Sequence, residues 1–288
     1  MFLLDWLPRT LLYIFLVLSM FSIGLQTTPG EIRSLLASRA HIVQLLLANF
    51  VVVPLIGIVM IRTIPFDLAT ETAFLLLAFT PGGISMLQFT TKFKGEALFA
   101  GSSAFIMSLL ALFISPVLLE LVHPDEITVV IPHGRVIAFI ALFMLLPLMT
   151  GMLVCHNLEH MAQKLIKPCA LIGTTAFIGM MVVTGSLRKE AFQAVGQDAL
   201  FAIVIFIIIS MIAGWYMGGP HKETRPVFAT ISSMRNIALC ALIAVNTFPD
   251  EAVLHSLLAF AALMVPMNMV FTLVTLFRFK RADKAKQG

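Results

Sequence analysis

The sequence predicts an all-α polytopic membrane protein. Of the 288 residues, 59% are hydrophobic and only 12% are charged, and the mean hydropathy is +1.00. A soluble protein of this size could not bury so much apolar surface, whereas a bilayer accommodates it. The apolar residues also fall into separate runs, each near the ~20 residues that a helix needs to cross the hydrocarbon core.

Nine such segments can be separated, and the loops between them are too short for a soluble domain. They lie at about 11–27, 40–62, 69–92, 97–121, 133–154, 165–187, 196–217, 225–248 and 252–277. We therefore expect residues 1–288 to form one transmembrane domain with nine helices. No small-residue cleavage site follows the first segment, which is expected to be a retained helix rather than a signal peptide.

Basic residues set the predicted orientation. With nine spans the termini lie on opposite sides, and the loops on the side of the C-terminal tail hold most of the 19 Lys and Arg residues. The loops on the other side hold only Arg9, Arg62, Arg135, Arg188 and Lys189. Cytoplasmic loops are enriched in basic residues, so the pattern predicts an outside N-terminus and a cytoplasmic C-terminus in the cell (inner) membrane.

Several classes of function find no support in the sequence. The net charge of +4 comes from basic loops and a basic tail, so no nucleic-acid partner is expected. The three cysteines, Cys155, Cys169 and Cys240, have neither metal-ligand spacing nor a disulfide pattern. The sequence also has no phosphate-binding loop, Ser/His/Asp arrangement or zinc spacing. We therefore expect no catalytic residues, no resident cofactor and no metal centre.

Segment 69–92 is interrupted in its middle by Pro81, Gly82 and Gly83. Proline lacks a backbone donor and clashes with the preceding turn, and glycine disfavours helix, so we expect two half-helices here. Freed backbone groups in lipid need partners in the protein or water in a cavity. Gly82 and Gly83 are therefore candidate substrate contacts as well as helix-break residues. A proline kink in a continuous helix is the alternative.

Segment 225–248 is interrupted in the same way by Ser232-Ser-Met-Arg-Asn236, in which Ser232 is the expected helix-break residue. Each interrupted segment is followed by a tight turn and then by a long segment with an internal proline. In the predicted topology the two units start from opposite sides of the membrane. We therefore expect an inverted repeat whose two broken helices cross at the midplane, an arrangement typical of transporter binding sites.

Arg235 is the only charged residue near the middle of a hydrophobic segment. A charge at bilayer depth costs ~2.5–3.5 kcal/mol on insertion scales, so it normally faces a cavity or the protein interior. No Asp or Glu lies deep in a segment to pair with it. Two interpretations stay open. Arg235, Ser233 and Asn236 bind an anionic substrate, or the guanidinium locks the crossing by binding freed carbonyls.

Asn49 lies in the middle of segment 40–62, five residues before Pro54. Buried amides in membrane helices usually form hydrogen bonds between helices. Asn49 is a candidate for this role and equally for a substrate contact in the cavity.

These motifs together resemble the bile acid:sodium symporter family. The matching residues are Ser22-Ile-Gly-Leu25, Asn49-Phe-Val-Val-Val-Pro54, Thr80-Pro-Gly-Gly83, Ile114-Ser-Pro116 and Met234-Arg-Asn236. The resemblance covers nearly the whole chain and is that of a nine-helix, bacterial-type member. It implies a panel domain, about 11–27 and 133–187, and a core domain, about 40–121 and 196–277. The substrate cleft would lie between them beside the crossing, and the substrate would be an organic anion such as a bile acid or a small carboxylate.

The chain departs from the family pattern at the sodium ligands that the resemblance implies. Ile231 and Arg235 stand where the family has Glu and Gln, and Met86 and Leu87 stand where it has Ser and Asn. Asn49 stands where the family has a sodium-binding Gln. Hard cations need oxygen ligands, which Ile, Met and Leu side chains lack. Both sodium sites are therefore expected to be lost, with the Arg235 guanidinium replacing the charge of the cation.

The expected function is secondary transport of a small organic anion across the lipid bilayer by alternating access, independent of sodium. Uniport or exchange is favoured over proton coupling, because no deep carboxylate could carry a proton. Two alternatives stay open: a sodium-coupled organic anion symporter with atypical sites, and a non-transporting membrane receptor or scaffold of the same fold.

Overall fold

The computed structural model describes residues 2–81, 97–122, 138–187, 195–220, 224–248 and 252–287. All regular structure within them is helical, as predicted. Five helical stretches in the described part are long and apolar enough to cross a membrane: Leu7–Leu25, Arg39–Thr63, Ala138–Asn157, Gln197–Met217 and Ala252–Phe279. Shorter apolar helices lie at Leu68–Phe79, Phe105–Ser115 and Ile237–Thr247. The count of nine spans stays a prediction.

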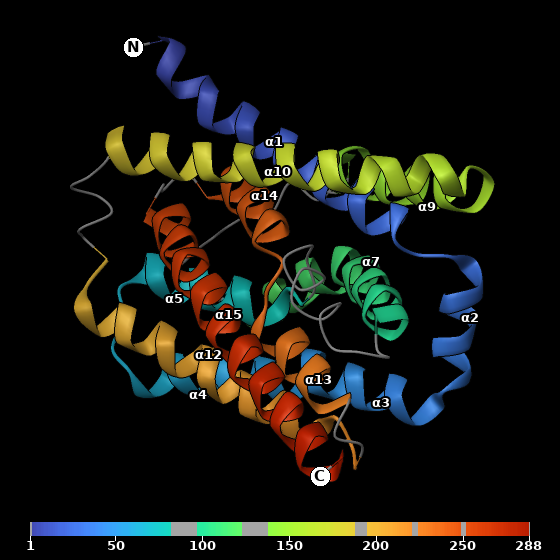
Figure 1. Cartoon of the computed structure of the whole chain (residues 1–288). Helices are drawn as coiled ribbons and strands as arrows, with labels where there is room; N and C mark the ends of the chain where they lie inside the picture. The colour runs from blue at the N-terminus through green and yellow to red at the C-terminus, as the bar shows by residue number, and fades with distance from the viewer. Residues whose placement is uncertain are drawn as a thin grey trace.

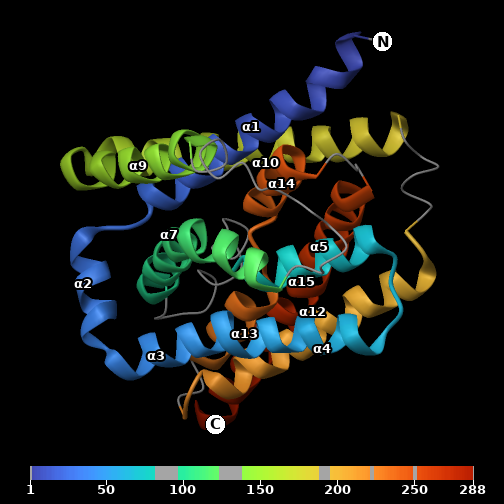
Figure 2. The same cartoon turned by 180° about the vertical axis from the view of Figure 1, so that it is seen from behind.

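Three helices form a layer of their own: α1 (Phe2–Leu25), α9 (Leu146–Asn157) and α10 (Glu159–Leu187) (Figures 1 and 2). Gly24 lets the backbones of α1 and α9 touch, because a Cβ there would lie 2.2 Å from the carbonyl oxygen of Leu148. Without a hydrophobic driving force between helices in lipid, such close backbone contact is a main source of packing energy.

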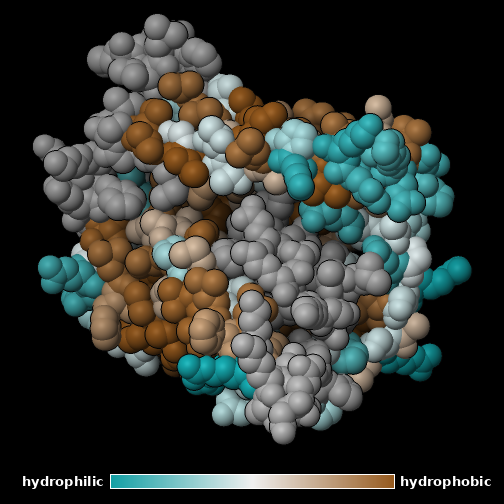
Figure 3. Space-filling model, viewed as in Figure 1, coloured by the Kyte–Doolittle hydropathy of each residue, from teal (hydrophilic) through white to brown (hydrophobic). Residues whose placement is uncertain are grey.

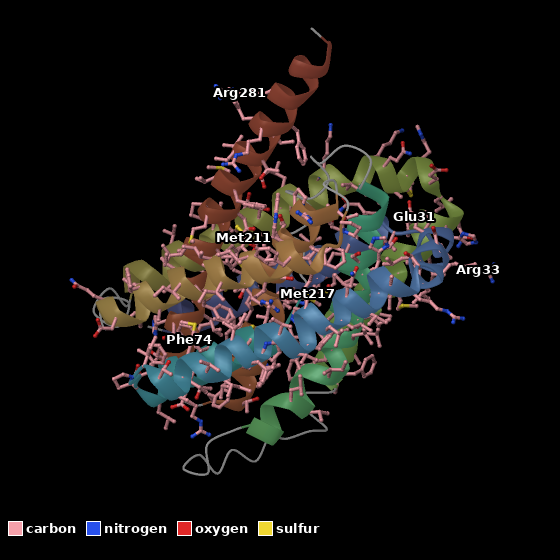
Figure 4. All side chains as sticks on the ribbon, turned by 90° about the horizontal axis from the view of Figure 1, so that it is seen from below. Glu31, Arg33, Phe74, Met211, Met217 and Arg281 are labelled. Carbon is pink, nitrogen blue, oxygen red and sulfur yellow. The ribbon has the colours of Figure 1, made fainter. Side chains whose placement is uncertain are left out.

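The remaining long helices lie on one side of this layer (Figures 1 and 2). They are α3 (Arg39–Leu47), α4 (Val53–Thr63), α5 (Leu68–Phe79), α7 (Ala97–Val122), α12 (Gln197–Met217), α13 (Thr224–Ser233), α14 (Ile237–Thr247) and α15 (Ala252–Gln287). Aromatic rings join three of them: the ring of Phe206 on α12 lies 5.9 Å from Phe74 on α5 and 5.9 Å from Phe260 on α15. Figure 4 shows Phe74 among these helices.

Helix α2 (Pro29–Ala37) connects the two groups of helices and was not predicted. It stands at one edge of the molecule, running across the ends of α1 and α3 (Figure 1), and Figure 4 shows Glu31 and Arg33 there. A capping box starts it: the Glu31 N–H donates to Thr28 Oγ1 at 3.3 Å, and the Thr28 N–H donates to Glu31 Oε2 at 2.8 Å. This Thr-Pro-Gly-Glu signature is readable from the sequence.

Two short π-helices interrupt otherwise regular spans, each just before a proline. The first, η1 (Ala48–Val52), precedes Pro54, and the second, η2 (Ala141–Leu145), precedes Pro147. Proline removes one helical hydrogen bond and crowds the preceding turn, and a wider turn accommodates it without ending the helix. The first of these turns contains Asn49.

Several helix ends differ from the predicted boundaries. Helix α10 begins at Glu159, six residues before the predicted start at 165, and α15 continues to Gln287, ten residues beyond the predicted end at 277. The predicted boundaries followed hydrophobicity, but backbone hydrogen bonding continues into polar residues outside the apolar run. Arg281 on this extension lies on the protruding end of α15 (Figure 4).

The outer surface carries large exposed apolar side chains. Examples are Leu55 on α4, Leu171 on α10, Phe201 on α12 and Phe277 on α15. Figure 3 shows brown, hydrophobic surface over the helices, with hydrophilic surface gathered near α2 and the turn between α9 and α10. An apolar surface of this extent is a liability in water but is the expected outer face of helices in lipid.

The contact at Gly24 generates a stability prediction. Replacing Gly24 by Leu should force α1 and α9 apart, at a cost of about 1–3 kcal/mol or more. Gly30→Ala is the matched control, because a Cβ at Gly30 has no neighbour within 4 Å. Melting of the purified protein in detergent, followed by size-exclusion chromatography, measures both. Equal melting temperatures for Gly24→Leu and Gly30→Ala would contradict the close contact.

Candidate functional site

Two helix ends meet in the middle of the molecule. Helix α5 ends at Phe79 and α13 ends at Ser233, and the non-helical residues that follow, Pro81 and Arg235, form an antiparallel bridge. The backbone N–H of Asn236 donates to the carbonyl oxygen of Thr80 at 2.9 Å. We call this pairing, of residues 80–81 with residues 234–236, the crossing.

Proline explains why α5 ends here rather than bending. A residue before proline is disfavoured in the helical region, and Thr80 has φ −114° and ψ 73°. Gly82 and Gly83, predicted to complete this break and to contact the substrate, lie outside the described residues. The described half of the break is therefore Thr80 and Pro81.

Side chains from α7, from α15 and from the crossing itself bind backbone groups at these helix ends. Ser115 Oγ on α7 donates to the carbonyl oxygen of Phe79 at 2.6 Å. The sulfur of Met264 on α15 accepts from the Arg235 backbone N–H at 3.2 Å. Asn236 caps α14, its Oδ1 accepting from the Leu239 N–H at 3.1 Å. Buried backbone groups in a membrane protein need such internal partners, so these contacts hold the crossing together.

The side chain of Arg235 is 2% exposed and only partly satisfied. Its Nη2 donates to the carbonyl oxygen of Ser232 and to Asn49 Oδ1, the latter at 3.5 Å. Its Nε and Nη1 have no hydrogen-bond partner among the described residues. The contacts found for the side chain are a carbonyl and an amide oxygen, and no carboxylate of the described residues pairs with it. An incompletely paired buried cation favours the approach of an anion.

A small cavity lies beside the crossing, between the two groups of helices. Its walls come from α1 and α10 on one side, and from the crossing, α14 and α15 on the other. The lining residues are Phe15, Ser19, Met20, Phe177, Arg235, Asn236, Ile237, Ala238, Ala261, Met264 and Val265. Its volume of about 20 Å³ gives room for about one water molecule.

Hydrogen-bond donors gather at this cavity. Besides Nε and Nη1 of Arg235, the Nδ2 of Asn236 and the hydroxyl of Ser19 are buried without partners in the part of the chain that the structure describes. Ala238 lies in the first turn of α14, where a helix supplies no acceptor for backbone N–H groups and carries partial positive charge. Of the described residues in this lining, Arg235 alone has a charged side chain. The chemistry of the site therefore matches a small anion.

The structure places the predicted site residues in different surroundings. Arg235 and Asn236 line the cavity. Ser233 turns to α15 instead, its Oγ donating to Asn268 Oδ1 at 2.8 Å. Asn49 contacts Arg235 and also donates to the Leu45 carbonyl at 3.0 Å. Ser232, predicted as a break residue, is the last but one residue of α13, which ends at Ser233, and it supplies the carbonyl that binds the guanidinium.

Four further residues at the site were not singled out from the sequence. Ser19, Phe15 and Phe177 belong to the helices across the cavity, and Met264 supplies a sulfur acceptor. Ser19 and the phenylalanines lie in apolar runs, where nothing local marks one hydroxyl or one ring among several. Only the packing of α1 and α10 against α14 and α15 brings them to Arg235.

The comparison with protein families decides the affiliation of the chain. The model described as "Sodium Bile acid symporter family" matches residues 13–195. The chain belongs to this family. Its members are membrane transporters and not enzymes, in agreement with the composition. The chain is accordingly a multi-pass membrane transporter of the bile acid/sodium symporter type.

Curated relatives agree with this assignment over almost the whole chain. The ileal sodium/bile acid cotransporter of Mus musculus is 25% identical over 95% of this chain and 79% of its own length. The human protein of the same description is 25% identical over 84% of this chain and 71% of its own length. An uncharacterized sodium-dependent transporter of Bacillus subtilis is 21% identical over 96% of this chain and 85% of its own length.

The contact of Ser115 with the broken end of α5 can be tested. Ser115→Ala should leave the buried Phe79 carbonyl unsatisfied and destabilise the protein by about 1–3 kcal/mol. Thr63→Ala removes a hydroxyl that bonds only to carbonyls of its own exposed helix end, and should change little. Thermal melting of the two purified variants compares them. A Ser115→Ala melting point within error of Thr63→Ala would show that the contact is dispensable.

Proposed function

We propose that this chain is a secondary transporter that moves a small organic anion by alternating access and does so without sodium. Membership of a transporter family supplies the general activity. The observation that carries the proposal is the cavity beside the crossing, where Arg235, Asn236 and Ser19 present buried donors that have no acceptor among the described residues.

An anion in this cavity would relieve an electrostatic cost. The guanidinium is surrounded by protein, and its hydrogen bonds go to neutral oxygens. A carboxylate would add the attraction between opposite charges, which is strong in a low-dielectric interior, and it can accept two parallel hydrogen bonds from a guanidinium. A bound anion would also interact favourably with the N-terminus of α14. The energy for substrate binding thus comes from groups that the fold leaves incompletely paired.

The surroundings of Arg235 do not fit a sodium ion. The oxygens of Ser232 and Asn49 already accept from the guanidinium. Ile231 is fully buried and has no side-chain oxygen, and a cation placed here would face the positive charge of Arg235. Met86 and Leu87, which stand where the family resemblance places other sodium ligands, lie outside the described residues. These features support the proposal that the Arg235 guanidinium takes the place of a bound sodium ion.

The arrangement of the helices supports a mechanism in which two bodies move against each other. We propose that α1, α9 and α10 belong to the panel domain and the other long helices to the core domain. The full fold would then have nine spans and an inverted repeat, with the N-terminus outside and the C-terminus cytoplasmic in the inner membrane. The cavity has walls from both groups of helices, so their relative movement would open it to one side or the other.

Two alternatives rest on specific observations. Sodium coupling with atypical ligands is favoured by the relatives, which are described as sodium cotransporters or as sodium-dependent. A receptor or scaffold without transport is favoured by the contacts of Nη2, which tie Arg235 to Ser232 and Asn49 and would lock the crossing. In the proposal the guanidinium binds the anion and replaces the charge of sodium. In the first alternative sodium is still bound, and in the second the guanidinium only holds the crossing together.

Sodium dependence separates the first alternative from the proposal. The purified full-length protein is heated with acetate, benzoate, succinate or taurocholate, in sodium chloride or in potassium chloride. At least one anion should stabilise it, by about 2.7 kcal/mol at 100 times its Kd, with the same Kd within twofold in both salts. Uptake of that anion into proteoliposomes should likewise not require sodium. A Kd or an uptake rate that depends strongly on sodium would establish coupling instead.

Substitutions of Arg235 separate binding from locking. Arg235→Gln should weaken anion binding more than about thirtyfold, because loss of a buried charged partner costs 2–5 kcal/mol. Arg235→Lys keeps the charge and should lose less than about tenfold, since only the planar fork is missing. Asn49→Ala removes an acceptor of Nη2 and should lower the melting temperature with little effect on Kd. If Arg235→Gln changes stability but not Kd, the guanidinium is a lock.

A further inference from the structure

The cavity beside the crossing has two chemically different walls, and the difference bears on which anion it takes. The crossing contributes the donors of Arg235 and Asn236. The opposite wall is contributed by α1 and α10, where the rings of Phe15 and Phe177 lie 4.7 Å apart between centroids at an interplanar angle of 35°. Met20 extends this apolar wall.

The geometry points to a compact monoanion with a flat apolar body as the ligand. Its single anionic group would meet Arg235, Asn236 and Ser19, and its body would lie against Phe15 and Phe177. This inference rests on the proposed transport function and specifies the substrate class of the same site.

The charge of the lining argues for a monoanion. Among the described residues that line the cavity, Arg235 is the one cation, and every other side chain except those of Ser19 and Asn236 is apolar. A second carboxylate on the same ligand would have to enter the wall formed by Phe15 and Phe177. An ionised group without a partner in such surroundings is strongly disfavoured. Dianions of the same size are therefore expected to bind much more weakly.

The rings argue for a flat apolar body. Aromatic side chains bind other aromatic groups in offset or tilted arrangements, with an advantage beyond the buried area alone. On the crossing side, Ala238 and Ala261 leave more space next to Arg235 than larger residues would. A planar ring fits between such walls better than a bulky branched group.

The size of the cavity adds a condition. Its volume of about 20 Å³ holds about one water molecule, so a ring with a carboxylate enters only when α1 and α10 move away from α14 and α15. The ligand would then bridge the two groups of helices, with its head on the crossing and its body on α1 and α10. Phe15 and Phe177 are thereby specificity-determining residues that act on the body of the substrate and not on its charge.

The test compares four probes on the purified full-length protein. Benzoate has one charge and a ring, terephthalate has the ring and two charges, benzyl alcohol has the ring and no charge, and acetate has the charge and no ring. We expect benzoate to bind at least tenfold more tightly than each of the other three in thermal-shift titrations at pH 7.5. Terephthalate or benzyl alcohol binding as tightly as benzoate would overturn the inference.

Substitutions of Phe177 test whether the aromatic wall causes the preference for benzoate. Phe177→Ala should weaken benzoate at least fivefold and leave acetate within twofold, whereas Phe177→Leu, which keeps apolar bulk, should be intermediate. Phe201→Ala is the matched control, since that ring is 70% exposed on α12 and does not line the cavity. Equal weakening of benzoate and acetate by Phe177→Ala and Phe177→Leu would overturn the role of the ring.

The outcomes for the two proposals are distinguishable. If wild-type protein binds acetate, succinate or taurocholate but does not prefer benzoate, the substrate class proposed here is wrong and anion transport stands. If it binds no anion of either panel, the transport proposal and the substrate class both fail.

Discussion

The structure depends on one constraint: α5 ends at Phe79 and α13 ends at Ser233 inside a lipid-embedded protein, and the backbone groups freed at these ends must find partners there. The Thr80 carbonyl and the Asn236 N–H satisfy each other across the crossing. Ser115 on α7 and Met264 on α15 take up two more groups. Each partner comes from a different helix, so the positions of α7 and α15 around the crossing are set by hydrogen bonding as well as by apolar packing.

The same constraint explains why a charge can be held here. Breaking α13 frees the carbonyl of Ser232, which gives the Arg235 guanidinium an acceptor, and the π-turn before Pro54 brings Asn49 to it. These oxygens accept hydrogen bonds from Nη2, whereas Nε and Nη1 have no acceptor among the described residues. The fold therefore offsets part of the cost of burying the cation, and in the proposed function a bound anion would offset more of it. Within the proposed function, Nη2 would hold the crossing while Nε and Nη1 bind the anion, so one guanidinium would serve both purposes.

How much of this is readable from the sequence depends on the residue. Pro81 and Arg235 break rules that apply locally, a proline inside an apolar run and a charge at bilayer depth, so the helix ends and the central charge were predictable. Ser19 and Phe177 break no rule, and only the packing of distant helices brings them to the cavity. Helix α2 was predictable from its capping box but was missed because hydrophobicity alone defined the segments. The substrate contacts at Gly82 and Gly83 and the sodium positions Met86 and Leu87 stay predictions.

The Arg235 guanidinium differs from a bound sodium ion in one respect that matters for transport: the guanidinium cannot dissociate from the site. In the proposed mechanism, when the two groups of helices close without a substrate, Arg235 faces the apolar wall of Phe15 and Phe177 with two nitrogens that lack a partner among the described residues. When they close around an anion, the charge is neutralised and those donors gain acceptors. The loaded form is therefore favoured in the closed conformation relative to the empty one. Within the proposed function, this asymmetry favours exchange of one anion for another over uniport, which requires the empty site to cross.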